Sequence, residues 1–360
     1  MNTPTTGMES FFTELSSLLN ALRKDFDSMM RNGKAGANLS RRDVRFLVDT
    51  YYQIQEFRKA SGNQERAAGK HNEPHRMISE WFKLYEMLED VANAQLRTWS
   101  NYAGPEGQWA QQITGIGHVL AAGLSAFIDM DKATTVSKVW RIAGQDASVR
   151  WLGADKAEKM VKDVFTRLNI KKNYTAAFAE LALLTNRKVE SLLLSAKRLG
   201  KGKITKDSIE KAVALRPWNA RFKTLCWKIG DSFVKCQNRG SYYGFIYAEK
   251  KAEYVAKNDA GEYAEVAAEK LASKSKFSAH QRAVMKEGKL PDIQIDLRAR
   301  RKAIKLFLSH YWVMAYRSYY HKEPPAPYII QHGGHVDYVS PEHVLQWETD
   351  EKARLKEEAA

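Results

Sequence analysis

The chain has 360 residues, 44% of them hydrophobic, and carries 57 Lys and Arg against 42 Asp and Glu, so its formal net charge is +15. This length leaves room for two or three domains with a sizeable core, and the hydrophobic share argues against long-range disorder. A positive surplus of this size attracts polyanions, of which nucleic acid is the commonest, although charge alone also fits an anionic membrane or an acidic protein.

The cysteine count and the hydropathy pattern restrict the compartment. Cys226 and Cys236 are the only cysteines, so neither a disulfide framework nor a four-cysteine zinc site can form. No window approaches 18 uninterrupted apolar residues, and the first 23 residues lack the positively charged start of a signal peptide. We therefore expect a cytoplasmic protein with no cofactor and no membrane partner.

Apolar residues recur at helical spacing along most of the chain, and strand patterns are nearly absent, which predicts an all-α, multidomain protein. Residues 1–104 are predicted to form an N-terminal helical arm with helices at 8–31, after a Ser40 cap, and at about 74–99. Successive amphipathic helices of this kind are typical of an antiparallel hairpin or a coiled-coil-like arm. We expect this arm to serve homodimerisation.

Residues 105–150 contain the most informative motif, an apolar–Gly–apolar–Gly turn between two short helices that matches a helix-hairpin-helix. Glycine permits a tight turn with positive φ, and the exposed N–H groups that open the second helix can hold a phosphate oxygen. Such a hairpin binds the nucleic-acid backbone and not a base sequence. The alternative is a helix–Gly–helix connection without a ligand. The predicted phosphate-binding residues are Thr114, Gly115, Ile116, Gly117 and His118.

Residues 151–215 form a basic helical insertion, in which positions 155–206 hold 13 Lys and Arg against 5 Asp and Glu, a net charge of +8. The spacing from Ala179 to Val189 resembles a helix-turn-helix, in which these two side chains would pack the helices together. Two amphipathic helices without DNA contact fit the same pattern, and Leu183 stands where the turn usually has glycine. The residues predicted to face the major groove are Asn186, Arg187, Lys188 and Ser191.

Residues 216–322 are predicted to continue with helices at 218–235 and 295–320, separated by a charged helical arm at about 247–271. A cationic stripe follows one face of the last helix at i, i+3, i+4 and i+7, opposite an apolar face, and could track a phosphate backbone. The alternatives to phosphate contact are solvation of the stripe and intramolecular pairing with an acidic arm. The stripe consists of Arg298, Arg301, Lys302 and Lys305, and Arg221 adds to the predicted contacts. Residues 323–360 are predicted to form an extended, loosely ordered tail.

Two blocks resemble the C-terminal domain of insertion-sequence transposases of the 110/116/902 group. They run from Gly115-Ile116-Gly117 to Ala143-Gly144 and from Asn219-Ala220-Arg221 to Leu225. Longer stretches, including 47–55, 216–235 and 307–310, are similar to uncharacterised proteins common in bacteriophage genomes. These resemblances imply a DNA-binding protein of phage or mobile-element origin, with DNA favoured over RNA.

The resemblance does not extend to the family's metal-dependent catalysis. Its N-terminal ribonuclease-H-like domain, with four acidic ligands, has no counterpart among the predicted helices of residues 1–104. The resemblance also implies a nucleophilic serine after the Ala-Gly pair, for which Ser148 is a weak candidate. His332 and His335 in the tail are interpreted as loop residues, not metal ligands. The alternatives are an active serine-dependent transposase, recombinase or nuclease, and a non-catalytic phage protein that binds an acidic host protein.

Overall fold

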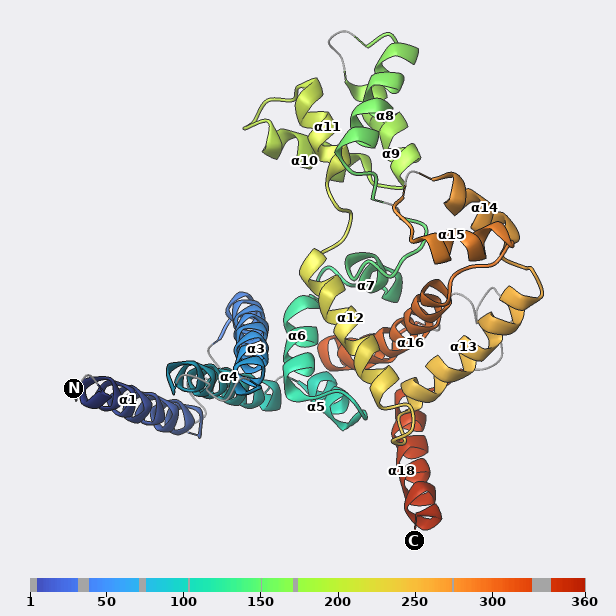
Figure 1. The fold of residues 1–360 in the computed structure, drawn as a ribbon. Coiled ribbons are helices and arrows are strands. Elements are labelled where there is room, and N and C mark those ends of the chain that lie inside the picture. The colour runs from blue at the N-terminus through green and yellow to red at the C-terminus, as the bar shows by residue number, and fades with distance from the viewer. Residues whose placement is uncertain are drawn as a thin grey trace. The chain divides into compact units, whose positions relative to one another are not determined.

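The computed structural model describes residues 5–31, 39–70, 76–102, 104–149, 151–170, 174–273, 275–325 and 338–359. Over these residues the protein is all-α, with 16 helices and no strand, as the sequence predicts (Figure 1). The chain divides into two compact units. The first combines Met1–Thr134 with Lys228–Ala360, and the second is Thr135–Trp227.

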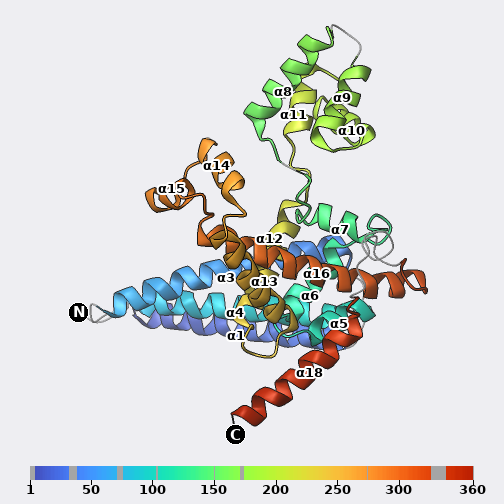
Figure 2. The same cartoon turned by 90° about the vertical axis from the view of Figure 1, so that its right-hand side faces the viewer.

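The first unit begins with the predicted N-terminal helices, α1 (Thr5–Arg31), α3 (Arg41–Gly69) and α4 (Arg76–Tyr102). They lie side by side as three long helices (Figure 2). Ser40 caps α3 as predicted, because its hydroxyl accepts from the Asp43 amide at 3.3 Å and the Asp43 carboxylate accepts from the Ser40 amide at 2.9 Å. An ion pair between Arg58 and Glu89 joins α3 to α4.

The core of the first unit is an aromatic cluster held by helices far apart in the sequence. Phe233, Tyr243 and Phe307 are buried with ring centroids 4.9 to 5.4 Å apart, and Trp109 stacks on Phe307 at 5.9 Å. Such pairs stabilise the core beyond their buried area. The helices concerned are α5 (Pro105–Gln112), α12 (Ala220–Lys235), α13 (Tyr242–Asp259) and α16 (Asp292–Tyr320), and α6 (His118–Phe127) packs on α5.

A smaller core lies at the start of α16, where α14 (Ala264–Ala272) and α15 (Ala279–Lys286) pack on it through Ala267, Met285 and Ile295. The prediction of one helical arm over about 247–271 is wrong, because this segment forms two helices and not one. The chain turns at Gly261, whose φ of +80° is a conformation that favours glycine, so α13 ends before the turn and α14 begins after it.

The C-terminal tail is also not extended throughout, because α18 (Pro341–Glu358) occupies most of it. Ser340 caps α18 by accepting from the His343 amide at 3.2 Å, and Pro341 stands in its first turn. Val344 is fully buried, and the Trp109 indole donates to the Pro341 carbonyl at 3.2 Å. The local composition is polar, so this tertiary burial is what stabilises the helix.

The second unit is built around α8 (Ala154–Arg167), α9 (Thr175–Thr185), α10 (Val189–Leu199) and α11 (Lys206–Ala214), preceded by α7 (Val136–Ile142). Its core is made of small and branched apolar residues from α8 to α11, among them Val161, Leu181, Leu192 and Ile209. In both units, no described helix is long and apolar enough to cross a bilayer.

Candidate nucleic-acid interface

The predicted hairpin is a turn between α5 and α6 in which only one glycine is required for its backbone conformation. Gly115 has a φ of +97°, and a Cβ there would stand 3.0 Å from the Ser232 hydroxyl and 3.3 Å from the Cys236 sulfur. Gly117 precedes α6 with an ordinary φ of −83°, and nothing lies within 4 Å of a Cβ built on it. Gly117 is exposed, so the N-terminus of α6 is open to solvent on this side.

An internal anion already occupies part of the predicted phosphate site. The Glu348 carboxylate, 2% exposed, accepts from the Thr114 amide at 2.8 Å and from the Thr114 hydroxyl at 2.5 Å. Its other oxygen accepts from the Tyr242 amide at 3.0 Å. Thr114 therefore binds a carboxylate of α18, and its contact with phosphate stays a prediction. A phosphate could reach this amide only by displacing Glu348.

The other hairpin residues divide between the core and the surface. The Gly115 carbonyl accepts from the Ser232 hydroxyl at 2.5 Å, and Ile116 is buried. The His118 ring bonds the Asn93 side chain, and burial, with the Arg97 guanidinium, lowers the pKa of His118. His118 is thus neutral at pH 7 and adds no positive charge. The first amides of α6, at Gly117 and His118, remain the donors that a helix N-terminus presents to an anion.

The second candidate motif has the predicted helix–turn–helix order, α9, a turn and α10, but not the predicted packing. Ala179 and Val189 are exposed, so they do not join the helices. The buried side of α9 instead consists of Ala177, Phe178, Leu181 and Ala182. The prediction was wrong because this helix is apolar on nearly every side, so its spacing does not define one buried face.

Two of the four residues predicted to face the DNA major groove, Asn186 and Arg187, instead bind other residues of the chain. The Arg187 guanidinium donates to the carbonyls of Ala212 at 2.9 Å and Leu215 at 3.3 Å, and burial lowers its pKa. Arg187 therefore closes the end of α11 and does not project into solvent. Asn186, left-handed at φ +49°, donates to the Ser148 hydroxyl at 3.2 Å. The remaining two predicted residues, Lys188 and Ser191, are exposed at the start of α10.

Ser148 lies in a turn in which its amide and hydroxyl both donate to the Asp146 carboxylate, at 2.9 and 2.7 Å. Partial burial favours the neutral acid, but hydrogen bonds from Ser148 and Arg141 outweigh it and lower the pKa of Asp146. A carboxylate with a lowered pKa is a weak general base. The contacts of Ser148 are those of a turn residue and do not supply an activated nucleophile.

The cationic stripe on α16 provides the clearest electrostatic feature. Its opposite face is buried as predicted, with Ile304, Phe307, Leu308, Tyr311 and Trp312 each at most 5% exposed. Arg298 lies over the Tyr263 ring, 4.7 Å from its centroid. Although Arg301 keeps solvent access, desolvation by the surrounding protein and the Arg298 guanidinium lower its pKa. Lys305 and Arg221 each take part in a further interaction within the chain.

A cation that sequence reasoning missed completes this group. Burial, and then the guanidinium groups of Arg298 and Arg301, lower the pKa of Lys270 on α14. We call Lys270, Arg298, Arg301 and Lys302 the cation cluster. Over the described parts of the chain, none of its members has a carboxylate within 4.0 Å. Lys270 is 28 positions before Arg298, and helical spacing within one segment cannot reveal such a neighbour.

Arg300 on the same helix shows what a structurally paired cation looks like here. Its guanidinium binds Asp296 at 2.6 Å and Asp231 at 3.1 Å. Asp296 in turn accepts from Tyr247 and pairs with Lys251 at 3.3 Å. Asp231 and Asp296 are therefore engaged by Arg300 and pair with no member of the cation cluster.

No group of three or more potential metal ligands is present among the residues that the structure describes. His332 and His335 lie outside those residues, so their interpretation as loop histidines stays a prediction. Comparison of the chain with protein-family models, with curated proteins and with solved structures found no match.

Proposed function

We propose that the protein binds the phosphate backbone of nucleic acid, DNA in preference to RNA, through the cation cluster on α14 and α16. The observation that carries the proposal is that Lys270, Arg298 and Arg301 lie close together and lack carboxylate partners among the described residues. Burial, and then neighbouring guanidinium groups, lower the pKa of Lys270 and of Arg301. Like charges held together without a counterion raise the free energy of the folded chain. A phosphate group placed between them would relieve that repulsion.

The chemistry of the cluster favours backbone contact over base readout. Guanidinium and ammonium groups on one helix face match the regular charges of a phosphate chain and carry no base preference of their own. The first amides of α6, at Gly117 and His118, are a second donor set for the same ligand class. The preference for DNA, and a phage or mobile-element origin, are supported by the transposase-like residues around Gly115 and Asn219.

The test is a titration of labelled duplex, single-stranded and branched DNA, and of RNA, followed by fluorescence anisotropy between 50 and 200 mM salt. Each phosphate contact to duplex DNA contributes a slope of about −0.9 to the plot of log affinity against log salt. Arg298→Gln combined with Arg301→Gln should therefore make that slope shallower by about 1.8. The matched control is Arg354→Gln with Lys356→Gln, which removes the same charge from α18.

Absence of binding to any nucleic acid at 50 mM salt would overturn the proposal, and so would an equal effect of the control variant. Tighter binding of RNA than of DNA would overturn the DNA preference alone. A covalent protein–DNA adduct that is lost on Ser148→Ala would instead support the serine-dependent recombinase.

We further propose that the N-terminal arm serves homodimerisation. Its three helices leave large apolar side chains exposed, which a second copy would cover. These are Phe11, Leu18, Phe46, Phe57 and Trp81, between 49% and 67% exposed. Light scattering should give a dimeric mass, and a monomeric mass at micromolar concentration would contradict this role.

A further inference from the structure

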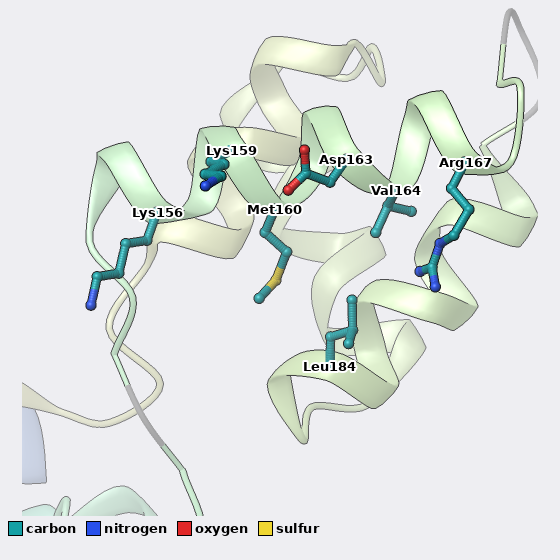
Figure 3. Close-up of a pocket in the computed structure, with 7 residues that line it drawn as sticks. All are labelled: Lys156, Lys159, Met160, Asp163, Val164, Arg167 and Leu184. Carbon is teal, nitrogen blue, oxygen red and sulfur yellow. The ribbon is translucent and has the colours of Figure 1, made fainter. Parts of the chain in front are cut away.

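The second unit contains a groove that the proposed function does not use. It lies between α8 and the C-terminal turn of α9 and has a volume of about 380 Å³, within the range of ligand-binding pockets. Figure 3 shows Met160 and Val164 from α8 converging on Leu184 from α9, so the floor of the groove is apolar. Leu184 is 51% exposed although it lies among apolar neighbours.

Outside the lining of the groove, α9 and α10 expose further leucines. Leu183 is 81% exposed and Leu194 is 67% exposed, and both belong to helices whose other faces are buried in the core. Glu180 is the only charged residue of α9, so this helix offers solvent almost no polar surface. A helix that is apolar on nearly every side is normally covered on all of them. Exposed leucines in this number therefore indicate a missing partner.

The rim of the groove is positively charged. Lys156 and Lys159 lie one helical turn apart on α8, and neither has a carboxylate within 4.0 Å over the described residues. Arg167, at the far end, is neutralised by Glu180, and Asp163 contributes one negative charge. The groove thus combines an apolar floor with two lysines at one end that form no ion pair among the described residues.

We propose that this groove binds an acidic amphipathic helix of a partner protein. Apolar side chains at i, i+3 or i+4 and i+7 of such a helix would cover Met160, Val164 and Leu184, and flanking carboxylates would meet Lys156 and Lys159. Nucleic acid fits less well, because a phosphate backbone has no apolar face to cover leucine. The aromatic rings on which bases usually stack are absent from the groove's lining.

The test starts with selection of random 16-residue peptides displayed on phage against the immobilised full-length protein. Selected peptides are then synthesised and titrated by fluorescence anisotropy. We expect acidic sequences with apolar residues at helical spacing. Leu184→Glu should weaken peptide binding at least tenfold, because it removes a central apolar contact. Lys156→Glu combined with Lys159→Glu should weaken peptide binding several-fold, and the effect should be larger at low salt.

The control is Ile293→Glu, which introduces the same charge at a side chain that is also 51% exposed, on α16 of the first unit. It should change peptide affinity less than twofold. Peptides without acidic residues, or peptides that bind Leu184→Glu as tightly as the unchanged protein, would overturn the proposal. Loss of duplex DNA binding on Leu184→Glu would also overturn it, because the groove would then belong to the nucleic-acid interface. The two peptide results do not depend on whether the cation cluster binds DNA.

Discussion

The Glu348 carboxylate joins α18 to the turn between α5 and α6, so its removal should destabilise both segments. Glu348→Ala leaves the amides of Thr114 and Tyr242 without their acceptor in a site that is 2% exposed. An unsatisfied buried donor costs about 1–3 kcal/mol, so two amides predict a loss of about 2–6 kcal/mol. The matched control is Glu357→Ala, an exposed carboxylate on the same helix, for which we expect a change within about 0.5 kcal/mol.

The loss can appear as local opening of α18 or as lower stability of the whole first unit, so the assay must separate the two. Hydrogen exchange followed by mass spectrometry reports the opening free energy of each peptide segment, and urea unfolding reports global stability. We expect faster exchange in residues 341–358 and in the turn around Thr114. Unchanged exchange in both segments, together with an unchanged urea midpoint, would show that Glu348 does not stabilise this contact.

Three further predictions concern His310, Gly115 and the two cysteines. Burial lowers the pKa of His310 to about 4 in the folded protein, whereas an imidazole in the unfolded chain is protonated near pH 6.5. The free energy of unfolding should therefore fall by about 3 kcal/mol between pH 6.5 and pH 4. His310→Gln should flatten that dependence in urea unfolding, and an unchanged slope would contradict the assignment. Gly115→Ala should lower the urea midpoint, because a φ of +97° and a distance of 3.0 Å to the Ser232 hydroxyl both disfavour a Cβ. An unchanged midpoint would show that glycine is not required there. Iodoacetamide should modify Cys236 before Cys226, because Cys226 is buried and burial raises the pKa of its thiol. Mass spectrometry of the native protein measures this order, and modification of Cys226 first would contradict the prediction.

Local sequence patterns were sufficient for most of the helices. The capping box at Ser40 and the apolar face of α16 follow from spacing within a few residues, and the structure confirms both. The helix at 341–358 was missed, although Ser340 and Pro341 are recognisable start signals. The polar composition of that segment hid the two buried positions, Val344 and Glu348, on which the helix depends.

The candidate sites were harder to predict, because the partners of their side chains and amides come from residues far away in the sequence. Glu348 lies 234 positions from Thr114, and no spacing rule connects a hairpin amide with that carboxylate. Arg187 was expected to face DNA but instead binds carbonyls 25 and 28 positions away. Lys270 joins the cation cluster only because α14 packs beside α16. A one-dimensional pattern identifies which side chains carry charge, and tertiary packing decides which of them stay unpaired.

Photo-cross-linking can locate bound nucleic acid on the protein and so shows whether the cation cluster is the binding surface. A labelled duplex bound at low salt is irradiated with ultraviolet light, and the cross-linked peptides are identified by mass spectrometry. We expect cross-links within residues 263–305, where Tyr263 is the aromatic side chain beside Arg298. These cross-links should be lost in Arg298→Gln with Arg301→Gln. Cross-links confined to residues 135–227, or cross-links that the double variant leaves unchanged, would contradict binding at the cation cluster.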